Sequence, residues 1–409
     1  MRILWVKVGG LWPLSAGGRL RSFHILKQLS ERHHVTLLTT HGADEDPEGL
    51  VEQLPSVEVV SVAHDGPKRG SARFAWALGR SWFSHLPVDL WRWQVPALRA
   101  EAERRLSRQA VDVCVADFLA AMPNVPKVSS ATRGETVPVV LFEHNVEHMI
   151  WKRLALVERQ AARRALLEME WRKMRRYEAQ ACTAADLTLT VSDADRMALA
   201  ELTPDASTRL RVVPTGVDTS YYHPNGVRPA GPELVFTGSM DWYPNEDAIL
   251  HFVDGILPRI RAAVPSTTLS VVGRAPSPRL RDAVEEAGGR VTGTVPDVRP
   301  YMGRACVYVV PLRIGGGTRL KIFEALAMGK AVVSTTVGAE GLPITSGVHF
   351  MQADNEQPFA DAVVSLLGNP ERRRVLGEAG RRLVEEKYSW TQAARAFESA
   401  CTEAVDHAH

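Results

Sequence analysis

The sequence predicts an α/β protein built from two doubly wound domains, each around a parallel sheet. Short apolar runs alternate with longer segments of helical periodicity, which indicates strands joined by helical crossovers. This alternation restarts near Glu233, after a segment rich in proline and glycine. A length of 409 residues suits two or three domains, and the single restart favours two.

The individual elements follow from these apolar runs. Buried strands are predicted at 3–8, 35–40, 57–62, 111–116, 137–142 and 187–191, and a helix at 20–32. The second series has predicted strands at 234–237, 268–272, 291–292, 307–310 and 331–334, and helices at 246–264 and 278–286. Seven prolines and glycines mark 213–232 as the linker. Ligands bind beyond the carboxyl ends of parallel strands, so we expect the chemistry in loops that face across this linker.

Composition and charge exclude several classes of protein. Hydrophobic residues make up 45% and charged residues 23%, which argues against disorder. The net charge of +2 argues against a dedicated nucleic-acid binder. No run of about 18 apolar residues predicts a membrane span, and the amino terminus does not resemble a signal peptide. Four scattered cysteines without a CxxC pair predict reduced thiols, no zinc site and a cytoplasmic location. The Ala- and Arg-rich composition suggests a bacterial source.

The strongest motif lies between residues 310 and 325. A predicted strand ends at Val310, and Gly315, Gly316, Gly317 and Thr318 follow just before a helix that carries Arg319, Lys321 and Glu324. Glycines allow close approach to an anion, and both the helix amino terminus and the two cations attract it. A carboxylate one turn further along suits two vicinal hydroxyls, as on a ribose. The pattern predicts a diphosphate site, although the Walker spacing is absent.

These motifs together resemble the retaining glycosyltransferases of family 4 (group 1), which have the two-domain GT-B fold. The stretch GGGTRLKIFEALAMGKAVVSTTVGAEGL (315–342) is similar to the nucleotide-sugar segment of that family. In the same order as in the family come LFEHNVEHMIWKRLA (141–155), VSDADRMAL (191–199), VVPTGVDTSYYHP (212–224) and GTVPDVRPYM (293–302). The resemblance implies an acceptor-binding domain at 1–213, a nucleotide-sugar-binding domain at 214–385, and a carboxyl-terminal helix within 386–409 that packs back on the first domain.

The sequence departs from the family pattern at two places. Gly316 stands where many members have the first of two glutamates, whereas Glu324 matches the second. The loop TGSMDWYPNEDA (237–248) lacks the Arg and Lys that many members place on the diphosphate. We expect Arg319 and Lys321 to replace them.

The resemblance also implies a role for each matching residue. His144, Arg319, Lys321 and Glu324 form the expected catalytic set, and Asn145 is expected to touch the acceptor. The donor is expected to contact Gly17, Gly18, Gly238, Ser239, Arg274, Thr294, Val295, Gly315, Gly316, Gly317, Thr318 and Glu324. The reaction expected is a metal-independent, front-face transfer from a UDP-, GDP- or dTDP-linked sugar, with no separate cofactor and no nucleic-acid partner. The acceptor is a glycan, a lipid-linked molecule or a small molecule.

Two further stretches carry open alternatives. Residues 147–181 have the apolar spacing of one long helix, with nine cations and five acids. This segment is expected to touch an anionic membrane surface or a phosphorylated acceptor, which would place the protein at the inner face of the membrane, or it is simply a solvated face. The stretch 74–93 contains four tryptophans and two phenylalanines, which line an acceptor groove or serve as core and loop anchors.

Other activities remain open at this point. A GT-B relative with different chemistry, such as a sugar-nucleotide epimerase or a pseudoglycosyltransferase, fits the same motifs. So does a non-catalytic sugar-nucleotide-binding protein, because the first glutamate is missing. A dinucleotide dehydrogenase is disfavoured, because neither first-strand loop reads GxGxxG.

Overall fold

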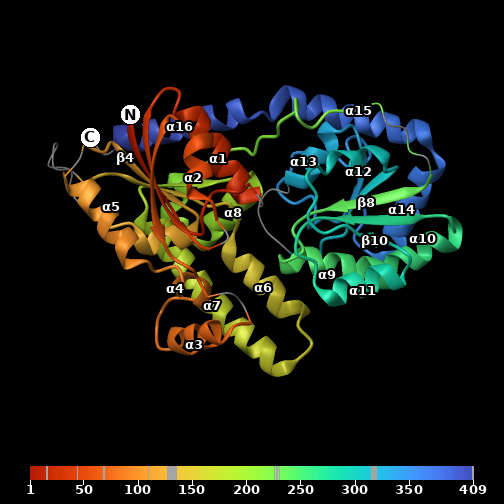
Figure 1. Cartoon of the computed structure of the whole chain (residues 1–409), viewed down its shortest axis with the longest axis horizontal. Coiled ribbons are helices and arrows are strands. Elements are labelled where there is room, and N and C mark those ends of the chain that lie inside the picture. The colour runs from red at the N-terminus through yellow and green to blue at the C-terminus, as the bar shows by residue number, and fades with distance from the viewer. Residues whose placement is uncertain are drawn as a thin grey trace. The chain divides into compact units, whose positions relative to one another are not determined.

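Two parallel sheets form the framework of the chain (Figure 1). The computed structural model describes residues 1–14, 17–43, 45–67, 70–108, 110–126, 136–224, 226, 229, 231–314 and 320–407. Two units result, Met1–Pro214 with Trp390–His409, and Thr215–Ser389, here called unit 1 and unit 2. Every pairing between the named strands is parallel.

The described part of unit 1 contains a seven-stranded sheet of order β3-β2-β1-β4-β5-β6-β7. Its strands are β1 (Arg2–Lys7), β2 (His34–His41), β3 (Val57–Ala63), β4 (Val113–Asp117), β5 (Val139–Phe142), β6 (Leu187–Thr190) and β7 (Leu210–Val212). Its α-helices are α1 (Gly17–Leu29), α2 (Pro47–Gln53), α3 (Ala72–Ser81), α4 (Val88–Trp91), α5 (Pro96–Arg108), α6 (Glu147–Val157), α7 (Ala161–Ala184), α8 (Asp193–Leu202) and α16 (Trp390–His407). Leu119–Asn124 and Pro204–Arg209 form 3₁₀ turns. Side chains of two core clusters cover the two faces of this sheet.

The described part of unit 2 contains a six-stranded sheet of order β10-β9-β8-β11-β12-β13. Its strands are β8 (Glu233–Thr237), β9 (Thr268–Val272), β10 (Arg290–Val291), β11 (Val307–Val310), β12 (Ala331–Ser334) and β13 (Met351–Gln352). Its α-helices are α9 (Tyr243–His251), α10 (Leu257–Ala263), α11 (Pro278–Glu286), α12 (Arg299–Arg304), α13 (Leu320–Ala327), α14 (Glu356–Gly368) and α15 (Pro370–Lys387). In both units an inner strand, β1 or β8, comes first along the chain, and later strands are added on either side of it. Such a switch in strand order creates a crevice at the carboxyl edge.

The long helix predicted at 147–181 is wrong as a single element. The structure has α6 and α7, separated at Glu158–Gln160. The Glu158 carboxylate accepts from the Gln160 amide at 2.9 Å, and its carbonyl accepts from the Arg164 guanidinium at 2.8 Å. The chain turns back at these residues, and α6 packs along α7. The predicted helix at 246–264 likewise contains a π turn at Phe252–Ile256 between α9 and α10.

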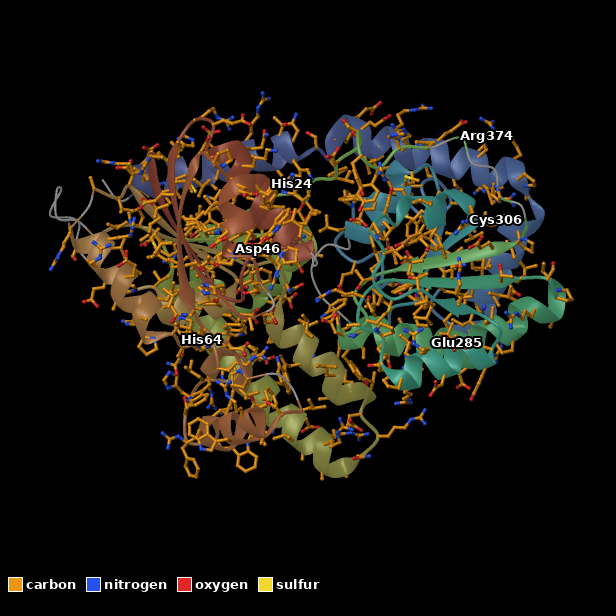
Figure 2. The ribbon with its side chains drawn as sticks, viewed as in Figure 1. His24, Asp46, His64, Glu285, Cys306 and Arg374 are labelled. Carbon is orange, nitrogen blue, oxygen red and sulfur yellow. The ribbon has the colours of Figure 1, made fainter. Side chains whose placement is uncertain are left out.

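Helix α16 belongs to unit 1, where it packs against α1 and the sheet. The Trp390 ring stacks on His24, with centroids 4.7 Å apart (His24 is labelled in Figure 2). Phe397 stacks on Trp5 at 5.0 Å, and Glu398 pairs with Arg32. Helix α16, at the other end of the sequence, therefore completes the core of unit 1. Among the described helices, none is both long enough and apolar enough to cross a membrane.

Candidate active site

In unit 2, strands β8 and β9 end in two glycines that touch. A Cβ atom on Gly273 would lie 1.7 Å from the carbonyl oxygen of Gly238, and the φ of Gly273 is +153°. Only glycine allows such a close approach of the two chains and readily adopts this backbone conformation. The carboxyl edge of the sheet therefore presents bare backbone at Gly238, one of the predicted donor contacts.

Arg274 is tied to the loop after β8. Its Nε atom donates to Oγ of Ser239 at 3.0 Å, and its guanidinium lies 3.1 Å from a carboxylate oxygen of Asp241. The arginine follows β9, whereas Ser239 and Asp241 follow β8. The structure thus brings together Ser239 and Arg274, which the sequence places 35 residues apart.

The ammonium of Lys321 lies beside Gly238. Lys321 is in the first turn of α13, and its Nζ donates to Oδ1 of Asn245 at 2.7 Å. Asn245 in turn donates to the carbonyl of Ser239 at 2.8 Å. A Cβ on Gly238 would lie 2.8 Å from that Nζ, which also stands 3.9 Å from the ring centroid of Phe236. A cation next to bare backbone is the arrangement that binds an anion.

Glu324 lies one turn after Lys321 and faces the interdomain segment. The Tyr222 hydroxyl donates a hydrogen bond to its carboxylate. Burial raises the pKa of Glu324 to about 7, against the opposing effects of Tyr222 and the charge of Lys321. The carboxylate therefore changes its proton occupancy near neutral pH.

The segment after β10 lies near Tyr221 and Tyr222. Thr294 is exposed, while Val295 is half-buried against the core cluster that Tyr222 also joins. Arg299 stacks over Tyr221, with its guanidinium carbon 3.8 Å from the ring centroid, and pairs with Asp297 at 2.8 Å. Gly315, Gly316, Gly317, Thr318 and Arg319 lie outside the described residues, so their predicted roles stay predictions.

In unit 1, His144 is buried between the carboxylate of Asp117 and the guanidinium of Arg21. Its Nε2 lies 2.7 Å from Oδ1 of Asp117, and its Nδ1 lies 3.0 Å from the Arg21 guanidinium. Burial lowers the pKa of His144 to about 3, against the raising effect of Asp117. The ring is therefore neutral, with the proton on Nε2 and Nδ1 accepting from Arg21.

Asp117 also neutralises a lysine from the adjacent strand. Nζ of Lys7 lies 3.1 Å from its Oδ2, and the Trp5 indole donates to the same oxygen at 2.9 Å. Burial alone would raise the pKa of Asp117, but Lys7 and His144 hold it below its usual value. Burial lowers the pKa of Lys7. These groups form a buried polar cluster at the carboxyl ends of β1 and β4, in which Asp117 is the counter-charge of Lys7.

Phe118 covers this cluster with a strained backbone. Its φ is +72°, a region that non-glycine residues rarely adopt. Its ring stacks on His144 with centroids 3.7 Å apart. A Cβ on Gly18 would lie 2.3 Å from the edge of that ring, so Gly18 must lack a side chain. Strained residues of this kind cluster at functional sites.

The remaining predicted residues of unit 1 frame the same edge. Gly17 and Gly18 lie in the first turn of α1 rather than in a separate loop. Asn145 follows His144 and donates to Glu147 at 3.1 Å. Burial raises the pKa of Glu143 well above its ordinary value, and nearby Glu178 and Glu147 raise it further.

Comparison with known protein families identifies the family to which this chain belongs. Residues 17–221 match the model of Glycosyltransferase Family 4, and residues 231–369 match that of Glycosyl transferases group 1. The chain belongs to glycosyltransferase family 4. It is therefore a transferase enzyme, as the resemblance implied.

Individual relatives of this glycosyltransferase are distant. The chain is 27% identical over 252 residues to the alpha-maltose-1-phosphate synthase of Mycobacterium tuberculosis. That match covers 53% of this chain and 63% of the synthase, so the chain spans less than two thirds of the length of that relative.

Solved structures resemble the glycosyltransferase over nearly its whole length. Anabaena HepE, solved in complex with UDP and glucose, has a TM-score of 0.69 at 15% identity and is matched over 98% of this chain and 100% of HepE. Sucrose-phosphate synthase from Thermosynechococcus elongatus has a TM-score of 0.73 at 17% identity, over 98% of both chains. These likenesses confirm the predicted α/β fold with two doubly wound domains of GT-B type.

Sequence reasoning missed several residues of this glycosyltransferase. Asn245 and Asp241 hold Lys321 and Arg274, while Lys7, Asp117 and Phe118 build the surroundings of His144. One signal was present, because charged Lys7 and Asp117 end the apolar strands β1 and β4. Their partnership became visible only when the two strands paired, with Lys7 opposite Asp117.

Proposed function

We propose that this glycosyltransferase moves a sugar from a nucleoside-diphosphate sugar to an acceptor hydroxyl with retention of the anomeric configuration. The proposal places the nucleotide on the carboxyl edge of unit 2 and the acceptor on unit 1. Metal is not required, and the acceptor is a glycan, a lipid-linked molecule or a small molecule.

The observation that carries this proposal is the ammonium of Lys321 beside the bare backbone of Gly238. Asn245 holds that ammonium at 2.7 Å, so the cation is already oriented before the donor arrives. Preorganised charge of this kind stabilises the negative charge that grows on a leaving diphosphate. Arg319 is expected to add a second cation, and the backbone amides of Gly315, Gly316 and Gly317 are expected to contact the phosphates.

Glu324 is the proposed partner of the ribose. Its carboxylate accepts a hydroxyl hydrogen bond from Tyr222. Two vicinal ribose hydroxyls would replace or join that donor. The bound UDP in the structure of HepE supports a nucleotide of this type.

The transfer proposed needs no dedicated base. The bond between the anomeric carbon and the diphosphate oxygen breaks, and the acceptor oxygen bonds to that carbon from the same face. The proton of the acceptor hydroxyl passes to the leaving phosphate oxygen. Neutral His144 is enclosed and held by Asp117 and Arg21, so we propose that it supports the carboxyl edge of unit 1 rather than carrying charge or transferring a proton.

A thermal-shift screen with UDP, GDP and dTDP and their sugars tests the proposal. A ligand that binds only the folded state must raise the melting temperature. We expect one nucleotide to do so in the wild type, and the Lys321→Ala variant to weaken its binding. Lys387→Ala removes an exposed lysine of α15 as the control and should leave binding unchanged. No shift with any nucleotide sugar would overturn the proposal.

Product NMR after incubation with donor and candidate acceptors separates the remaining chemistries. Transfer with retained configuration supports the proposal. An epimerised sugar nucleotide, a bond to a cyclitol, or tight donor binding without turnover would instead identify the three alternatives that the motifs left open.

A further inference from the structure

We propose that unit 1 docks on an anionic membrane surface through an aromatic–basic face formed by Arg73, Trp76, Arg80, Trp82 and Phe83. The inference concerns where the protein sits and does not depend on the donor chemistry proposed above.

Helix α3 has two different faces. Ala77 and Ser81 are buried, and Phe74 and Leu78 pack against the core of unit 1. The opposite face carries Arg73, Trp76, Arg80 and Phe83, at spacings of three, four and three residues. These positions share one side of a helix and its continuation.

Three aromatic side chains in and directly after α3 are unusually exposed. Trp76 is 61% exposed, Trp82 54% and Phe83 94%. Large apolar groups gathered in one short segment mark an interaction surface, whereas single exposed ones need no explanation. Trp91, by contrast, packs against the core, so only part of the aromatic stretch is available.

The charge of this segment is of one sign. Residues 66–88 contain Lys68, Arg69, Arg73 and Arg80 and no Asp or Glu. Arg80 lies over the Trp76 ring, with its guanidinium carbon 5.2 Å from the ring centroid. Tryptophan prefers the boundary between lipid and water, and clustered cations are attracted to anionic headgroups. This combination favours a membrane over an acidic or a neutral protein partner.

Helix α7 holds the face in place. Nζ of Lys173 donates to the carbonyls of Ser81 at 2.6 Å and Leu86 at 3.1 Å. Glu170 accepts from the Val88 amide at 2.7 Å. Figure 1 shows α3 beside α7 accordingly. Exposed Arg172, Arg175 and Arg176 of α7 extend the positive surface next to the aromatic one.

Vesicle flotation of the whole protein tests this proposal. We expect binding to vesicles of equimolar phosphatidylcholine and phosphatidylglycerol at low salt, and much less binding to phosphatidylcholine alone or at high salt. The variant Trp76→Ser/Trp82→Ser/Phe83→Ser should weaken partitioning by on the order of tenfold or more, because each buried aromatic contributes strongly. Arg73→Gln/Arg80→Gln should weaken it and reduce its dependence on salt.

Two matched controls keep the test specific. Met197→Ser/Val348→Ser/Val375→Ser removes three other exposed apolar side chains and should leave partitioning unchanged. Arg279→Gln/Arg395→Gln removes two exposed arginines elsewhere, with the same expectation. Melting temperature and nucleotide binding verify that each variant is folded.

Either of two results would overturn the docking proposal. One is the absence of vesicle binding at low salt by folded wild-type protein. The other is a concentration-dependent dimer in light scattering that the triple aromatic variant abolishes without any vesicle binding, which would assign the face to self-association. Failure of nucleotide binding would bear on the proposed function alone.

Discussion

Nε2 of His144 lies 2.7 Å from Oδ1 of Asp117, while the second oxygen of the same carboxylate lies 3.1 Å from Nζ of Lys7. One buried carboxylate therefore orients a neutral ring and neutralises a cation, and it also accepts from the Trp5 indole. The side chains of His144 and Asp117 are almost fully enclosed, so the geometry is independent of solvent.

Asp117→Asn should lower the free energy of unfolding by about 3 kcal/mol or more, because Lys7 is left buried without its counter-charge. Urea unfolding measures this loss. Asp112→Asn is the matched control, since Asp112 pairs at 3.1 Å with half-exposed Arg2 and should cost under about 1 kcal/mol. Similar losses in both variants would contradict the central position given to Asp117.

Gly18→Ala should lower turnover and destabilise unit 1 by about 1–3 kcal/mol, because the new methyl group would overlap the Phe118 ring and displace it from His144. Adding Phe118→Ala should relieve the overlap and recover part of the stability. Gly79→Ala, in helix α3 with open space around it, should be neutral or stabilising. Wild-type stability and turnover in Gly18→Ala would show that the ring contact has no consequence.

Lys321→Ala should lower kcat by about 10²-fold if the ammonium stabilises the leaving diphosphate, and Arg319→Ala should act in the same direction. Steady-state kinetics with the donor found by thermal shift measures both. Lys330→Ala provides a contrast, because that side chain binds the carbonyls of Gly303 and Ala305 and should affect stability more than turnover. An unchanged kcat in Lys321→Ala removes it from the mechanism.

The raised pKa of Glu324 predicts how the stability of the folded state changes with pH. Its pKa in the folded state is about 7, above the ordinary 4.5, so the folded state binds more protons between these two values. The contribution of Glu324 to stability therefore falls as pH rises from about 4.5 to about 7 and is constant above that.

Nucleotide affinity should follow the opposite course, because the ionised carboxylate is the better acceptor for ribose hydroxyls. We expect calorimetry to show affinity rising by on the order of tenfold through pH 7. Glu324→Gln should give a flat and weaker profile, and Glu286→Gln, which changes an exposed carboxylate at the end of α11, should retain the wild-type profile. Equal slopes in the two variants would exclude the ribose role.

Prediction from the sequence worked best where periodicity and motif order carried the information. Apolar runs such as 3–8 and 307–310 became β1 and β11, and the joint order of the motifs led to the family that the comparisons confirm. It worked least well where partners lie far apart along the chain. Asn245 is 76 residues from Lys321, and no local pattern connects them.

Apolar periodicity and local motifs are properties of neighbouring residues, so the α/β class, the two series of strands and the glycosyltransferase family could all be predicted from the sequence. That the basic segment folds back as α6 and α7 depends on contacts between distant residues. The carboxylate of Glu178 in α7 accepts hydrogen bonds from the backbone amides of Glu147 and His148 and thereby caps α6. The tertiary structure also shows which face of α3 is buried and that Asp117 joins Lys7 to His144. Each of these depends on packing and charge balance between distant segments, which no local pattern encodes.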